Sequence, residues 1–125
     1  MSAKSEAVLV VEDEIIVGMD LAVSLEDAGF AVIGPYASCD EALAALDNGE
    51  KPVRAGVLDI NLGEGVTSAP IASKLEELGV PFVFLSGYTA GRNKIFEQFP
   101  DAPRISKPCL PETLLHHIRA LTASA

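Results

Sequence analysis

Short apolar runs alternate with amphipathic helical patterns along nearly the whole chain of 125 residues. The first run, residues 7–11 (AVLVV), is wholly apolar, which is typical of a strand that is buried on both faces of a sheet. Strands that alternate with helices through short connections pair in parallel by right-handed crossovers. The pattern therefore predicts an α/β domain with helices on both faces of a parallel sheet.

Five strand–helix units are expected. Gly29 and Gly79 are predicted to end the first and third helices, and Asn48-Gly49 to end the second. The expected strands cover residues 7–11, 30–33, 53–60, 81–85 and 104–106, and the expected helices begin near residues 15, 38, 69, 93 and 110. Five such units predict a flavodoxin-like (βα)5 doubly wound sandwich with sheet order 2-1-3-4-5. The fourth helix, within residues 93–99, is expected to be short or irregular.

Several local features define finer expectations. Ser38 and Glu41 have the spacing of a capping box, and Gly34-Pro35 is expected to close the second strand. The first and last helices should each carry an apolar face. The residues concerned are Ile15, Met19, Leu21, Ala22 and Leu25 in the first helix, and Leu110, Leu114, Leu115, Ile118 and Leu121 in the last.

The composition fits one compact domain over residues 1–125, with its core between about residues 7 and 122. Hydrophobic residues make up 49% of the chain and aromatic residues 6%, so the core should be mostly aliphatic. The formal net charge of −9 opposes binding to nucleic acids and to anionic membranes. No apolar run approaches the roughly 20 residues that span a bilayer, and Cys39 and Cys109 form no CxxC pair. We therefore expect a soluble, cytoplasmic protein with two free thiols, as a monomer or a weak dimer.

Polar residues follow the ends of four of the expected strands. Glu12 and Asp13 follow the first strand, and Asp59 lies at the end of the third. Ser86 follows the fourth strand, and Lys107 follows the fifth. In a sheet of this kind, ligands bind beyond the carboxyl ends of the strands, at the switch point between strands one and three. Three carboxylates, a hydroxyl and an ammonium group are thus expected at one edge of the sheet.

Carboxylates gathered in one place favour a divalent cation, and Mg²⁺ combines one or two carboxylates with water and phosphate oxygens. Asp13 and Asp59 are the expected direct ligands, and Glu12 is expected to act through water. The backbone carbonyl of Asn61 is a further candidate oxygen donor. Asp59 is then the expected nucleophile, because a carboxylate that attacks phosphorus forms an acyl phosphate.

Lys107 and Ser86 complete the predicted site. Lys107 would neutralise one phosphoryl oxygen, and Ser86 would donate a hydrogen bond to another. Each of these residues taken alone is typical of an ordinary turn or helix cap. Their combination at the ends of successive strands predicts a site for phosphoryl transfer.

Four motifs resemble the receiver domains of bacterial response regulators, and the resemblance spans nearly the whole chain. The motifs are VLVVEDE at residues 8–14, VLDINL at 57–62, FLSGY at 84–88 and SKP at 106–108. The resemblance implies that Glu12 and Asp13 are the acidic pair and that Asp59 is the phosphoacceptor. It implies that Ser86 and Lys107 are the family's hydroxyl and lysine, and that the Lys107-Pro108 peptide bond is cis.

A narrower resemblance concerns residues 81–88. The stretch PFVFLSGY is similar to the Pro-Phe-x-Phe-Ala-Thr-Gly-Tyr signature of a receiver subfamily that is common as single-domain regulators. This resemblance implies a histidine kinase of the HWE or a related type as the phosphodonor. Ordinary receivers have an aromatic switch residue three positions before the lysine, where this chain has Arg104. Tyr88 is the candidate substitute for that switch residue.

The predicted function is a stand-alone receiver of a two-component phosphorelay that signals by protein contact. It would catalyse only its own phosphorylation and dephosphorylation, and it could serve as a regulator, a shuttle or a phosphate sink. One alternative is a Mg²⁺-dependent phosphohydrolase, but such enzymes typically need a second Asp where this chain has Asn61. The other alternative is a receiver-like module that binds its partner without phosphorylation.

Overall fold

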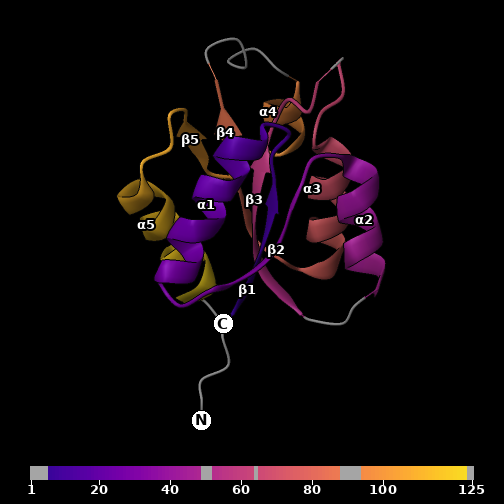
Figure 1. Cartoon of the computed structure of the whole chain (residues 1–125). Coiled ribbons are helices and arrows are strands. Elements are labelled where there is room, and N and C mark those ends of the chain that lie inside the picture. Colours follow the sequence, from indigo (N-terminus) through magenta and orange to yellow (C-terminus); the bar gives the residue numbers. More distant parts are fainter. Residues whose placement is uncertain (1–5, 49–51, 64, 88–93, 124–125) are drawn as a thin grey trace.

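The computed structural model describes residues 6–48, 52–63, 65–87 and 94–123 (Figure 1). Its strands and helices alternate along the chain. The strands are β1 (Ala7–Val11), β2 (Ala31–Tyr36), β3 (Val53–Asp59), β4 (Phe82–Ser86) and β5 (Arg104–Ser106). The helices are α1 (Ile15–Asp27), α2 (Cys39–Asn48), α3 (Ala69–Leu78), α4 (Ile95–Gln98) and α5 (Pro111–Ala123).

All strand pairs are parallel, and the sheet order is β2-β1-β3-β4-β5. This confirms the predicted flavodoxin-like sandwich and its order 2-1-3-4-5. The fourth helix is a single turn, α4, as expected from the weak pattern around it. Among the described residues, no helix is both long enough and apolar enough to cross a membrane.

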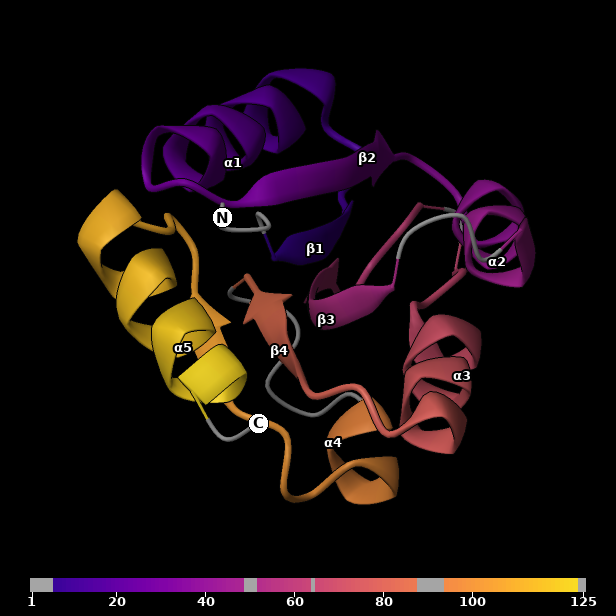
Figure 2. The same ribbon diagram turned by 90° about the horizontal axis from the view of Figure 1, so that it is seen from below.

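Side chains along the strands alternate between two apolar layers, one on each face of the sheet. Val8 and Val10 pack with α1 and α5, whereas Leu9 and Val11 pack with α2, α3 and α4. Seen from below, α1 and α5 cover one face of the sheet, and the other three helices cover the opposite face (Figure 2). The sheet is therefore buried on both faces, as its apolar strands predict.

The aromatic side chains of the core gather on the α4 side of the sheet. Phe82, Phe84 and Phe99 meet edge to face, with ring centroids 5.3 to 5.9 Å apart. Phe96 joins them at 6.4 Å from Phe84. The guanidinium group of Arg104 lies 3.8 Å from the centre of the Phe96 ring, so a cation–π contact ties β5 to α4.

Helix ends follow their sequence signals. The Ser38 hydroxyl accepts a hydrogen bond from the Glu41 backbone N–H at 3.3 Å and donates one to its carboxylate at 3.2 Å, so the capping box forms. Gly79 ends α3 in the left-handed conformation, with φ of 72°.

The second strand does not stop at Gly34-Pro35, so that prediction is wrong. Strand β2 continues to Tyr36, and its register against β1 shifts at this point. Because β2 is an edge strand, the missing N–H of Pro35 is tolerated. Gly34 has φ of +106°, and a Cβ there would lie 2.7 Å from the Val10 carbonyl oxygen, so only glycine fits this irregularity.

The expected apolar face of the first helix is only partly in the core. Helix α1 packs through Gly18, Leu21 and Leu25, whereas Ile15 is 72% exposed and Met19 57% exposed. Ile16 and Val23 are exposed as well. Apolar residues cover more of this helix than the sheet can bury, so helical spacing alone does not identify the buried face. In α5, Leu114 and Ile118 are buried, but Leu110 precedes the helix and is exposed.

Candidate functional site

The carboxyl ends of four strands bring the predicted site residues to one edge of the sheet. Glu12 directly follows β1, and Asp59 is the last residue of β3. Ser86 ends β4, where Leu85 pairs with Asp59, and Lys107 directly follows β5. Because β1, β3, β4 and β5 are consecutive in the sheet, these ends lie side by side.

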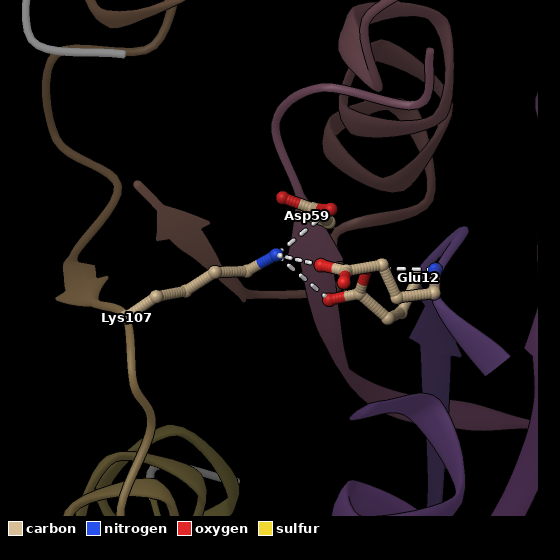
Figure 3. Close-up of polar contacts among 4 residues, drawn as sticks. Glu12, Asp59 and Lys107 are labelled. Carbon is tan, nitrogen blue, oxygen red and sulfur yellow. Dashed lines mark hydrogen bonds and ion pairs between the residues drawn. The ribbon is translucent and has the colours of Figure 1, made fainter. Parts of the chain in front are cut away.

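The side chain of Lys107 reaches across this edge to the acidic residues (Figure 3). Its Nζ atom lies 3.2 Å from Asp59 Oδ2, to which it donates a hydrogen bond. The same Nζ lies 3.1 Å from Glu12 Oε1. The lysine thus bridges the two acids that end β1 and β3.

Three carboxylates gather beside this lysine. One oxygen atom each of Glu12, Asp13 and Asp59 lies within 4.8 Å of the others. Glu12 is 2% exposed and Asp59 is 5% exposed, whereas Asp13 is exposed to solvent. Buried and exposed oxygen donors in one cluster fit a hard divalent cation that keeps some of its water, as Mg²⁺ does.

Glu12 is held in place by several elements. Its backbone N–H donates to the Tyr36 carbonyl at 2.9 Å, beyond the irregularity in β2. Its Oε2 accepts a hydrogen bond from the Glu14 N–H at 3.1 Å. Its Oε1 is buried and, among the described residues, accepts no hydrogen bond of good geometry, although the Lys107 ammonium lies close by. A buried carboxylate oxygen that accepts no hydrogen bond can accept one from a ligand or bind a cation.

Burial dominates the electrostatics of the acids. It raises the pKa of Glu12 to about 7, with hydrogen bonding to Asp59 adding to the increase. Burial also raises the pKa of Asp59, against the opposing effects of its contacts with Glu12 and Lys107. Burial alone would lower the pKa of Lys107, but the hydrogen bonds and charges of Glu12 and Asp59 outweigh it and raise that pKa. Without a cation, ionisation of all the clustered acids is therefore unfavourable, because Lys107 supplies a single positive charge.

Ser86 is the last residue of β4, and Asn61 follows the end of β3 by two residues. Ser86 is half-buried, and its carbonyl accepts the backbone N–H of Lys107 at 2.9 Å. Asn61 is exposed and forms an isolated antiparallel bridge with Thr67, in the turn that leads to α3. The hydrogen bond expected from Ser86 and the metal contact expected from Asn61 stay predictions.

The candidate switch residues are Tyr88 and Arg104. Tyr88 lies outside the described residues. Arg104 occupies the position at which ordinary receivers have an aromatic residue. It is exposed on β5, and its guanidinium group stacks on the Phe96 ring. The Lys107-Pro108 peptide bond is cis, as the family resemblance implies, and so is Gly34-Pro35.

One residue near the site was not among those predicted. Glu14 Oε1 lies 3.6 Å from Lys107 Nζ, and the Glu14 side chain is 65% exposed. The only sequence signal for it is its position directly after the acidic pair, which is equally typical of a helix start.

No protein-family model matches the sequence, and no curated protein matches it. Solved structures do match. The chain is similar to SdrG from Sphingomonas melonis Fr1, with 31% identity, a TM-score of 0.78 and coverage of 97% of this chain and 98% of that one. It is also similar to a response regulator receiver protein from Sinorhizobium medicae WSM419, with 26% identity, a TM-score of 0.84 and coverage of 98% of each chain.

A CheY-like response regulator receiver domain protein from Methanospirillum hungatei JF-1 shares the fold, with 23% identity, a TM-score of 0.82 and coverage of 97% of this chain and 96% of that one. The shared fold extends over nearly the full length of all three neighbours, and the acidic cluster lies at the switch point of that fold. The sheet order, the acidic cluster at this edge and these similarities together show that the chain has the receiver domain fold of response regulators.

Proposed function

We propose that this receiver domain accepts a phosphoryl group on Asp59 from a histidine kinase, in a reaction that depends on Mg²⁺. The observation that carries the proposal is the position of Asp59, whose Oδ2 lies 3.2 Å from Lys107 Nζ inside the acidic cluster. Attack of a carboxylate on phosphorus requires mainly positioning and neutralisation of charge. An acid beside a part-buried ammonium group and two further carboxylates meets both needs.

In the proposed reaction, an Asp59 carboxylate oxygen forms a bond to phosphorus while the P–N bond of the kinase phosphohistidine breaks. The imidazole nitrogen keeps the electron pair of the broken bond. Mg²⁺ held by Asp13 and Asp59, with Glu12 acting through water, would supply positive charge opposite the phosphoryl oxygens. Lys107 neutralises another phosphoryl oxygen, and the Ser86 hydroxyl donates a hydrogen bond to a third.

The second half of the cycle is hydrolysis of the acyl phosphate on Asp59. Water attacks phosphorus, the bond from phosphorus to the Asp59 oxygen breaks, and inorganic phosphate leaves as the carboxylate is restored. The protein therefore turns over only its own phosphoryl group and needs no second substrate. Its signalling output is a change in protein contact.

The kinase and the route of the signal are also part of the proposal. The stretch PFVFLSGY at residues 81–88 supports a kinase of the HWE or a related type as the phosphodonor. Arg104 and Tyr88 are proposed to take the place of the usual aromatic switch. The contact of Arg104 with Phe96 supports a role for it, because it joins β5 to α4.

Intact-mass spectrometry after incubation with acetyl phosphate and Mg²⁺ tests this proposal. The wild-type protein should gain the mass of one phosphoryl group, and EDTA should abolish the gain. Asp59→Asn should show no gain, whereas Glu6→Gln, a change of the same kind at the opposite end of the sheet, should behave as the wild type does.

A gain that survives in Asp59→Asn would move the phosphoacceptor elsewhere. No gain in the wild type, combined with no Mg²⁺-dependent binding of beryllium fluoride, would favour the receiver-like module that acts without phosphorylation.

A further inference from the structure

Lys107 has more carboxylate neighbours than the proposed reaction uses. Its Nζ lies 3.1 Å from Glu12 Oε1, 3.2 Å from Asp59 Oδ2 and 3.6 Å from Glu14 Oε1. The first two acids have roles in the phosphoryl-transfer site. Glu14 has none there, although it points a carboxylate at the same ammonium group.

An ammonium group has three N–H donors. In the resting site, three carboxylates lie within 3.6 Å of the Lys107 Nζ, and the contact with Asp59 has hydrogen-bond geometry. A phosphoryl oxygen on Asp59 would need one of these donors. Ion-pair attraction to Glu12 and Glu14 therefore opposes a shift of the ammonium group toward that phosphoryl oxygen.

The three partners differ in how easily they can be released. The Glu12 side chain is fully buried and is fixed by the Glu14 N–H, and Asp59 is itself the acceptor of the phosphoryl group. The Glu14 side chain is 65% exposed, so water can solvate its carboxylate as soon as the lysine leaves. Glu14 is thus the partner whose contact with Lys107 is lost at the smallest cost.

We propose that Glu14 is a positioning residue that holds Lys107 in the resting site and slows its movement to a phosphoryl group on Asp59. This inference rests on the proposed function, because it needs Asp59 to be phosphorylated. It assigns Glu14 an effect on the rate of the switch, exerted through Lys107.

The test compares Glu14→Gln with Glu26→Gln, which removes the same charge from an exposed residue at the other end of α1. Twelve residues of helix place the control about 18 Å from Glu14. With acetyl phosphate and Mg²⁺, the bond from Asp59 to phosphorus forms as the P–O bond to acetate breaks, and acetate keeps the electron pair. The rate of this step should rise about two- to fivefold in Glu14→Gln, the range of one exposed ion pair, and should stay at the wild-type value in Glu26→Gln.

A double-mutant cycle shows whether the effect passes through Lys107. In a Lys107→Met background, Glu14→Gln should no longer change the rate. A second readout does not depend on phosphorylation: in EDTA, the side-chain ¹⁵N resonance of Lys107 should shift in Glu14→Gln and not in Glu26→Gln.

An unchanged or lower rate in Glu14→Gln overturns the inference while leaving the proposed function intact. An equal rise in Glu26→Gln, or a rise that persists without Lys107, also overturns it, because the effect would then be general repulsion of an anionic donor. The Lys107→Met protein could react too slowly to measure. In that case, a Lys107 resonance that does not shift in Glu14→Gln overturns the inference. A wild-type protein that takes up no phosphoryl group contradicts the proposed function and this inference together.

Discussion

Two ion pairs of the same length lie at opposite ends of the sheet. Lys107 and Glu12 are 3.1 Å apart at the carboxyl ends of the strands, and Arg54 and Glu6 are 3.1 Å apart near the amino ends of β1 and β3. The Glu12 side chain is fully buried, whereas the Arg54 and Glu6 side chains are 39% and 41% exposed. Equal distances therefore correspond to different electrostatic interactions, because water screens the Arg54–Glu6 pair more than the Lys107–Glu12 pair, whose lysine is 23% exposed.

Charge balance separates the two ends further. Within the described part of the chain, Arg54 has one acidic partner, and its guanidinium also donates to the Thr122 carbonyl at 3.2 Å. Lys107 faces Glu12, Glu14 and Asp59, and Asp13 belongs to the same acidic cluster. The pair near the amino ends is balanced and contributes to structure. The carboxyl-end site has an excess of negative charge, which a divalent cation would relieve.

The largest expected effect comes from removing the basic partner at each end. Lys107→Met should lower the free energy of unfolding of the metal-free protein by about 2 to 4 kcal/mol at about pH 8, because it leaves buried carboxylates unpaired. Arg54→Met should lower it by less than about 1 kcal/mol, as for exposed pairs. Urea unfolding in EDTA measures both. Equal losses would mean that the two ends do not differ in the way described.

The pH dependence of stability should come next in size. The pKa of Glu12 is raised from 4.5 to about 7 in the folded protein, so the folded state binds more protons than the unfolded state between those values. Stability should therefore be highest below about pH 5 and fall as pH rises through about 7, by on the order of 1 to 3 kcal/mol. Glu12→Gln should flatten this fall in metal-free unfolding experiments, and Glu6→Gln should leave it unchanged. A fall that persists in Glu12→Gln would assign it to another group.

Mg²⁺ should stabilise the carboxyl-end site and have no effect at the other end. At a Mg²⁺ concentration ten times Kd, binding to the folded state adds about 1.4 kcal/mol to the free energy of unfolding. Thermal unfolding with and without Mg²⁺ should show this gain in the wild type and in Glu6→Gln. The gain should be much smaller in Asp13→Asn. An equal gain in Asp13→Asn would place the cation elsewhere.

The smallest effect is expected for the pair near the amino ends. A double-mutant cycle between Arg54→Gln and Glu6→Gln should give a coupling of no more than about 1 kcal/mol. The coupling should shrink further in about 1 M salt, since the Debye length there is about 3 Å. A coupling that is larger, or that does not respond to salt, would mean that this pair is as poorly hydrated as the one at the site.

The fold could be predicted because its signals are local. Continuous apolar runs mark the strands, and the capping box of Ser38 and the glycine after α3 mark helix ends. Sequence failed where neighbours in space decide the outcome. The second strand continues through Gly34-Pro35, which its predicted place at the sheet edge allows. What the local sequence does not show is that pairing with β1 resumes at Tyr36 after a shift in register. Ile15 and Met19 have helical spacing, yet only packing against the sheet decides which side of α1 is buried.

The site was predictable to the level of its residues but not of their interactions. Strand ends in a parallel sheet must meet, so Glu12, Asp59 and Lys107 were expected at one edge. That Lys107 also faces Glu14, and that Arg104 stacks on Phe96, depends on side-chain directions that spacing does not encode.

The most direct test of the central claim is the response of the protein to beryllium fluoride, a phosphoryl mimic, with Mg²⁺. In ¹H–¹⁵N NMR spectra, we expect shifts of backbone resonances at the carboxyl ends of β1, β3, β4 and β5 that require both reagents. The same resonances should not move in Asp59→Asn, and those around Arg54 and Glu6 should stay in place in the wild type. Shifts that persist in Asp59→Asn, or none in the wild type, would contradict the claim that Asp59 is the phosphoacceptor of a Mg²⁺-dependent switch.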